Sequence, residues 1–231
     1  MSAAERDSYE QGLALARAGR HAQAIGHFET ALGERPGDTR VLFALGNTAR
    51  DLGMPEAAEN FFRRVLAADP QRIEALVNLA NLLRAQGAFA AAGALIAPAL
   101  ARYPELPELW LTLGSIHRET GDAAAAAEHY RGALARKFDY APALCNLADL
   151  LADEGRSEEA LALYGRALRA DPGNAQAQLN RAILHLGRGD LKEGWRDYAA
   201  RLKVVNKVPR PEHCLERWAG ASLRRKRLLV T

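Results

Sequence analysis

The chain has 231 residues, of which 48% are hydrophobic and 26% are charged, and this balance excludes the intrinsically disordered classes. No stretch approaches the roughly 18 uncharged apolar residues that cross a bilayer, and the N-terminal MSAAERDSYEQG lacks the apolar core of a signal peptide. We therefore expect a cytoplasmic protein without a membrane span. Two cysteines, Cys145 and Cys214, are too few for a disulfide framework or a multi-cysteine metal site.

The formal net charge of +3 is unevenly distributed. Residues 201–231 carry nine Lys or Arg and two Glu, whereas the first 200 residues carry 22 basic and 26 acidic side chains. Because the larger part is mildly acidic, charge alone offers no phosphate-binding face. The sequence predicts no nucleic-acid partner.

A period of 34 residues runs through the chain from Glu5. The fifteenth position of the period is glycine in all six copies: Gly19, Gly53, Gly87, Gly121, Gly155 and Gly189. The twenty-eighth position is leucine in all six: Leu32, Leu66, Leu100, Leu134, Leu168 and Leu202. Such agreement in register indicates six copies of one structural unit.

Other positions of the period suggest what that unit is. The eighth and twentieth positions are small, the twenty-fourth is large and mostly aromatic, and the thirty-second is proline in four copies. Glycine at the fifteenth position ends a first helix, and proline ends a second one. Small residues let the two helices approach closely, and the large residue fills the space beside them. The unit is therefore a helical hairpin.

The predicted copies follow one another in chain order at about residues 5–38, 39–72, 73–106, 107–140, 141–174 and 175–208. A single hairpin cannot bury its apolar face, but stacked hairpins can. We expect an all-α, right-handed superhelical solenoid of twelve antiparallel helices with a concave face, followed by a short non-repeat tail. In the middle copies Phe62, Tyr130 and Tyr164 should be buried between helices.

This spacing resembles the tetratricopeptide repeat over residues 5 to about 208, which is about nine tenths of the chain. In that family the concave groove is lined mainly by the second, fifth, ninth and twelfth positions of the first helix. Here the fifth position forms an apolar track, the ninth is mostly polar, and the twelfth is arginine in three copies. The resemblance implies a peptide-binding groove lined by Phe43, Asn47, Arg50, Val77, Asn78, Asn81, Arg84, Leu111, Ser115, Arg118, Asn146 and Asp149.

The composition of this predicted groove suggests its ligand. Asparagine side chains offer both donors and acceptors to a bound main chain, and the arginine row favours an acidic protein or peptide. The alternative is that the same side chains form a solvated or intramolecularly paired face. Three asparagines at the sixth position are also similar to the asparagine ladder of O-linked N-acetylglucosamine transferases: Asn78, Asn146 and Asn180.

No pattern of residues indicates catalysis. The six histidines form no HExxH motif and no zinc-binding spacing with cysteine, no serine lies in a GxSxG motif, and glycines occur singly at repeat turns rather than in a phosphate-cradling loop. The sequence predicts no catalytic, cofactor or metal site, and we do not expect this chain to be an enzyme by itself.

The last part of the chain departs from the repeat. Its sequence, EGW followed by ERWAGASLRRKRLLVT, resembles the junction at which bacterial tetratricopeptide repeats run into a glycosyltransferase-like domain, although Ala199 and Ala200 replace the usual acidic and aromatic pair. The matching residues are Glu193, Gly194, Trp195, Tyr198, Arg201, Trp218, Gly220, Leu223, Lys226, Leu228, Leu229 and Val230.

This second resemblance implies that residues 209–231 are a linker and the first strand, Arg227 to Thr231, of a truncated following domain. The repeats would then be the recruiting arm of a glycosyltransferase-like protein. The alternative is a stand-alone assembly adaptor that forms a homo-oligomer through its groove or its ends. An isolated strand leaves main-chain groups unpaired, so we expect it to pack on the end of the solenoid or to pair with a second copy.

Overall fold

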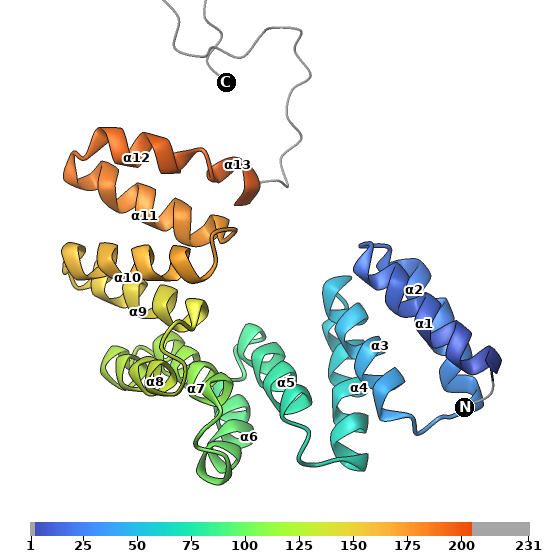
Figure 1. The fold of residues 1–231 in the computed structure, drawn as a ribbon. Helices are drawn as coiled ribbons and strands as arrows, with labels where there is room; N and C mark the ends of the chain where they lie inside the picture. Colours follow the sequence, from blue (N-terminus) through green and yellow to red (C-terminus); the bar gives the residue numbers. More distant parts are fainter. Residues whose placement is uncertain (1–2, 205–231) are drawn as a thin grey trace, which may run out of the picture.

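The computed structural model describes residues 3–204, and every regular element among them is a helix (Figure 1). The helices are α1 (Ala3–Arg17), α2 (His21–Glu34), α3 (Thr39–Asp51), α4 (Pro55–Ala68), α5 (Ile73–Ala85), α6 (Phe89–Arg102), α7 (Pro107–Glu119), α8 (Ala123–Arg136), α9 (Ala141–Asp153), α10 (Ser157–Ala170), α11 (Ala175–Arg188), α12 (Leu191–Tyr198) and α13 (Arg201–Val204). The all-α prediction is confirmed.

Consecutive helices pair as hairpins, and the hairpins stack in chain order along a curved path from α1 and α2 to the hairpin of α11 and α12 (Figure 1). Each repeat therefore contributes one odd-numbered first helix and one even-numbered second helix. This is the expected superhelix, in which a repeat is stabilised mainly by its neighbours.

The turn inside each hairpin is closed in the same way. In the second repeat Gly53 has a φ of 71°, which costs glycine no Cβ penalty. Its N–H donates to the Arg50 carbonyl oxygen at 2.9 Å, and the Met54 N–H donates to the Ala49 carbonyl oxygen at 2.9 Å, a Schellman motif. The equivalent glycines of the other five repeats also have positive φ and donate in the same pattern. The predicted role of the fifteenth position is confirmed.

The contact between the two helices of a repeat explains the small residue at the eighth position. A Cβ placed on Gly46 would lie 2.6 Å from Cε1 of Phe62, and one placed on Gly114 would lie 2.7 Å from Cε1 of Tyr130. Phe62 and Tyr130 are fully buried and Tyr164 is 2% exposed, as predicted. The large side chain at the twenty-fourth position thus fills the space that the missing Cβ leaves.

The sixth repeat differs from the expected hairpin. Its second helix, α12, is only eight residues long and ends at Tyr198; a tight turn follows, in which the Ala200 N–H donates to the Asp197 carbonyl oxygen at 3.0 Å, before α13. The buried carboxylate of Asp197 pairs with Arg181 at 2.8 Å, where middle repeats have leucine in place of the arginine. The predicted linker and strand, within 205–231, lie outside the described residues.

Candidate functional site

The predicted groove residues lie on one face of the stacked first helices, which we call the first-helix face. Its apolar track, Phe43, Val77 and Leu111, is half-buried. The centroid of the Phe43 ring lies 5.9 Å from that of the buried Phe62 ring, and the Arg72 guanidinium lies 4.5 Å from the centroid of the Phe43 ring. The track is therefore partly anchored in the core and partly accessible.

Polar side chains of this face join neighbouring repeats. The Asn78 amide donates to Asn47 Oδ1 at 2.8 Å, and the other two contacts of the same kind run from Asn146 to Ser115 Oγ at 3.3 Å and from Asn180 to Asp149 Oδ1 at 2.9 Å. Each contact links the ninth position of one repeat to the sixth position of the next. We call these six residues the polar ladder: Asn47, Asn78, Ser115, Asn146, Asp149 and Asn180.

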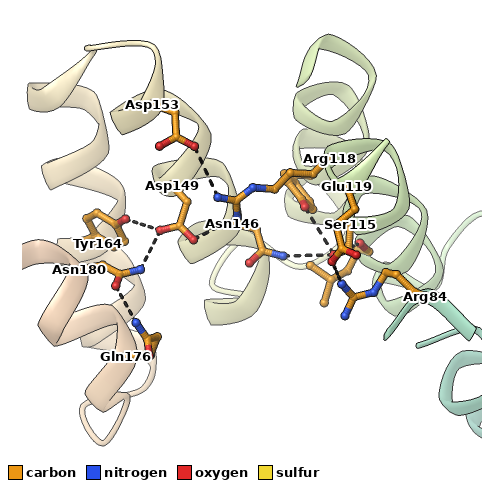
Figure 2. A network of polar contacts seen from close by, with 12 residues as sticks. Arg84, Ser115, Arg118, Glu119, Asn146, Asp149, Asp153, Tyr164, Gln176 and Asn180 are labelled. Carbon is orange, nitrogen blue, oxygen red and sulfur yellow. Dashed lines mark hydrogen bonds and ion pairs between the residues drawn. The ribbon is translucent and has the colours of Figure 1, made fainter. Parts of the chain in front are cut away.

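Asp149 is the most connected member of the ladder (Figure 2). Its carboxylate accepts from Arg118 Nη1 at 3.2 Å, from the Asn180 amide and from the hydroxyl of Tyr164. Burial, together with the adjacent Asp149 carboxylate, raises the pKa of Tyr164 well above its usual value, so this hydroxyl stays a donor. Arg118 also lies 3.5 Å from Asp153.

The other two arginines of the predicted row are also paired within the chain. Arg50 lies 3.0 Å from Asp51 and donates to Asn78 Oδ1 at 3.4 Å, and Arg84 forms an ion pair with Glu119 of the next repeat (Figure 2). The row is therefore an intramolecularly paired face, and an acidic ligand would have to compete with these carboxylates.

Two of the five inter-repeat steps lack a ladder contact: the first, where the two positions are the apolar Leu13 and Ala44, and the third. Asn81 occupies the ninth position of the third repeat, but the sixth position of the next repeat is Thr112, whose hydroxyl donates to the Glu108 carbonyl oxygen at 2.8 Å. In the described part of the chain the Asn81 amide has no side-chain hydrogen bond, and Nε of Arg84 is buried without a partner. The middle of the first-helix face thus carries unused donors and an unused acceptor.

Sequence reasoning assigned Tyr130 and Tyr164 to the core only, whereas their hydroxyls also reach the first-helix face. Tyr130 donates to Ser115 Oγ at 3.4 Å, and Tyr164 donates to Asp149. The signal was in the sequence: the ninth position holds Ser or Asp in the two middle repeats whose twenty-fourth position is tyrosine, 15 residues later. No comparable sequence pattern indicated that Glu119 is the partner of Arg84.

Cys145, at the same fifth position of its repeat as the residues of the apolar track, is expected to be a poor nucleophile. Burial raises the pKa of its thiol to about 11, so at pH 8 only about one thousandth is thiolate. In a Cys214→Ser variant, alkylation of Cys145 by iodoacetamide should be about a hundredfold slower in the folded chain than in urea. The rate should rise about tenfold per pH unit until the thiol titrates. Equal rates in both states would contradict this burial.

The described residues show no second candidate site with a recognisable catalytic or metal-binding chemistry. Among them, no three His, Cys, Asp or Glu side chains are grouped to hold a metal ion, and no helix is both long and apolar enough to span a bilayer. A hollow of about 290 Å³ is lined by Phe138, Asp139, Leu144, Arg166, Arg169 and Ala170. None of these residues belongs to the predicted groove.

Comparisons with solved structures find the same architecture. The chain is similar to a thermophilic TPR protein of Thermus thermophilus, at 26% identity and a TM-score of 0.68, over 79% of this chain and 99% of that one. It is also similar to PilF of Pseudomonas aeruginosa (21%, 0.69, 89% and 93%) and to the type IV pilus biogenesis factor PilW (18%, 0.71, 90% and 96%). No curated protein matches the sequence.

Family models give the same result from sequence. Models described as tetratricopeptide repeat match residues 15–76, 49–116, 107–140 and 145–203, which together include most of the described chain. The matches agree with the 34-residue period, the glycine turns and the stacked hairpins. The chain belongs to the tetratricopeptide repeat family.

Proposed function

We propose that this chain is a scaffold that binds an extended peptide or protein segment along its first-helix face. The observation that carries the proposal is the gap in the polar ladder at its third step: the half-buried Asn81 amide has hydrogen-bonding capacity that the described chain does not use. An asparagine amide can pair with one peptide unit of a bound main chain as donor and acceptor at once. The neighbouring track residues Val77 and Leu111 offer apolar contacts to its side chains.

The location of the gap in the polar ladder favours a role of Asn81 in binding a ligand over a role in holding the repeats together. Asn47 and Ser115, which hold the same position in the neighbouring repeats, are occupied by ladder contacts and are therefore less available. An acidic side chain on the ligand could approach Arg84, whose charge is already shared with Glu119. We therefore expect main-chain recognition at Asn81 to contribute more affinity than charge does.

The test is a binding comparison between two asparagines. Peptides of about 12 residues would be selected from a random display library on the full chain, resynthesised with a fluorophore and titrated by polarisation. The Asn81→Ala variant should bind them about tenfold more weakly, because its amide would lose two hydrogen bonds that together contribute about 1.4 kcal/mol. The melting temperature of the same variant should not change, since Asn81 makes no side-chain hydrogen bond within the described residues.

The matched control is Asn60→Ala, which removes an exposed asparagine from the second helix α4. Peptide affinity should be unchanged in this variant. Raising the salt concentration should weaken binding only for acidic peptides. Selected peptides that bind the wild-type chain and Asn81→Ala equally well would place the binding surface elsewhere and overturn the proposal.

We also propose, from the sequence alone, that the scaffold serves a cytoplasmic glycosyltransferase-like protein. The support is the resemblance of residues such as Trp195, Trp218 and Gly220 to a repeat–glycosyltransferase junction. The self-associating adaptor remains the alternative. A glycine-rich, phosphate-cradling loop encoded directly after Thr231 in the natural reading frame would favour the first, and a stop codon there would favour the second.

A further inference from the structure

The junction between the fourth and fifth repeats departs from the repeat pattern at two positions. The thirty-second position is proline in four copies, but the fourth copy has Phe138 there. The twenty-ninth position is glycine or alanine in the first four copies, but the fifth copy has Arg169. Although they are far apart in the chain, both side chains line the same hollow of about 290 Å³. Two departures that meet at one place indicate a role that the other junctions do not share.

The hollow combines an apolar lining with an exposed aromatic ring held in place. Leu144 in the lining is fully buried, whereas Phe138 is 74% exposed, the most exposed large apolar side chain of the described residues. The Arg166 guanidinium lies 4.1 Å from the centroid of the Phe138 ring, and it donates to the Phe138 carbonyl oxygen at 2.8 Å. An exposed aromatic ring fixed beside arginines has the composition of an interface hot spot.

The charges of the hollow favour one kind of ligand. Neither Arg166 nor Arg169 forms an ion pair within residues 3–204, and the one carboxylate in the lining belongs to Asp139. The lining therefore carries a net charge of +1, from two guanidinium groups and one carboxylate. Such a site can pair with a single carboxylate. A phosphate dianion is less suitable, because Asp139 repels it.

Stacking of the repeats does not require the two departures. At the junction of the first and second repeats Arg64 holds the position of Arg166, and it donates to the Pro36 carbonyl oxygen at 3.0 Å. There the thirty-second position is proline and the twenty-ninth position of the second repeat is Ala67. The contact between neighbouring repeats thus forms with proline and alanine, which leaves the ring and the second arginine of the hollow without a role in stacking.

We propose that this hollow is a second docking site, which binds an acidic segment of a protein partner. One carboxylate of the segment pairs with Arg169, and a neighbouring large apolar side chain packs on the Phe138 ring and Leu144. The volume lies just below the range of about 300–1,000 Å³ of small-molecule pockets, so it suits one or two side chains. None of the lining residues belongs to the predicted groove, so the site is independent of ligand binding on the first-helix face.

The double variant Phe138→Pro/Arg169→Ala tests the site, since it gives this junction the residues of the first one. The variant should fold normally. Lys137, which precedes the new proline, already has a φ of −138° and a ψ of 96°, the extended conformation that proline requires of its neighbour. The Phe138 N–H makes no main-chain hydrogen bond among the described contacts. The melting temperature should stay within about 2 °C of that of the wild-type chain.

The probe is a display library of 12-residue peptides, each with one Asp or Glu beside a Leu, Phe or Trp. Peptides would be depleted on the double variant, selected on the full wild-type chain, resynthesised and titrated by fluorescence polarisation. The double variant should bind them about tenfold more weakly, because it lacks both the aromatic contact and the ion pair. Changing the acidic residue of the peptide to its amide should weaken binding about threefold in the wild-type chain and not at all in Arg169→Ala.

The matched control is Arg131→Ala, which removes an exposed arginine of α8 outside the hollow and should leave the affinity unchanged. Recovery of no peptide after depletion, or equal binding of acid and amide peptides, would overturn the proposal. Weaker binding to Asn81→Ala would place the peptides on the first-helix face and also overturn it, whereas unchanged binding there separates the two sites. Sedimentation of the chain alone gives a further readout: self-association that the double variant abolishes would assign the hollow to a second copy instead.

Discussion

Replacing Phe62 with alanine should lower the free energy of unfolding by about 3–5 kcal/mol, the largest effect that we expect from a single substitution in this chain. The ring is fully buried between α3 and α4, beside Gly46 and the Phe43 ring, so its removal leaves a cavity that the helices cannot easily close. Urea denaturation followed by circular dichroism measures the change. A loss under about 1 kcal/mol would show that the hairpin collapses around the missing ring.

Two further variants test the contact between Gly46 and Phe62, and a natural repeat of this chain serves as their reference. Gly46→Ala should cost about 1–3 kcal/mol, since the new Cβ meets Phe62 at 2.6 Å. The third repeat has Ala80 and Ile96 at these two positions, both fully buried. The double variant Gly46→Ala/Phe62→Ile reproduces that natural pair, so it should be more stable than the sum of the single losses predicts. Strict additivity would mean that the two positions are not coupled.

The hairpins and their turns could be predicted from the sequence because each depends on residues close in the chain. Glycine at a left-handed position ends the first helix wherever it occurs, and the pairing of a small eighth with a large twenty-fourth position repeats every 34 residues. Because the pattern occurs six times in one chain, it can be recognised without an alignment. The break between α12 and α13 was not predicted, since the 34-residue pattern continues through Leu202 without interruption.

The sequence predicts which residues lie on the first-helix face, but it does not predict which of them form hydrogen bonds or ion pairs with one another. The positions of Asn47, Arg84 and Asp149 on one face follow from helical periodicity. Whether Arg84 is free depends on Glu119, which lies 35 residues away and reaches it only through the angle between neighbouring repeats. That angle is set by the packing of whole hairpins. Sequence spacing therefore left open the choice between an arginine row free for a ligand and a paired one.

The hydrogen bonds and ion pairs of the first-helix face should also affect folding stability. If the polar ladder holds the repeats together, its most connected member should matter for folding. Asp149 is the acceptor for Arg118, Tyr164 and Asn180, and its side chain is only 20% exposed. Its removal would leave three donors without that acceptor, one of them charged. By contrast, Asn81 makes no side-chain hydrogen bond in the described part of the chain.

We therefore expect Asp149→Ala to lower the free energy of unfolding by about 2–4 kcal/mol, because unpaired partly buried donors keep their desolvation cost. Asn81→Ala, the ninth-position control, should change it by less than about 0.5 kcal/mol. Since a solenoid couples mainly nearest neighbours, hydrogen exchange in the Asp149→Ala variant should accelerate in α7–α11 and stay unchanged in α1–α4. Equal losses in the two variants, or acceleration spread over all helices, would mean that the ladder contacts do not stabilise the stack locally.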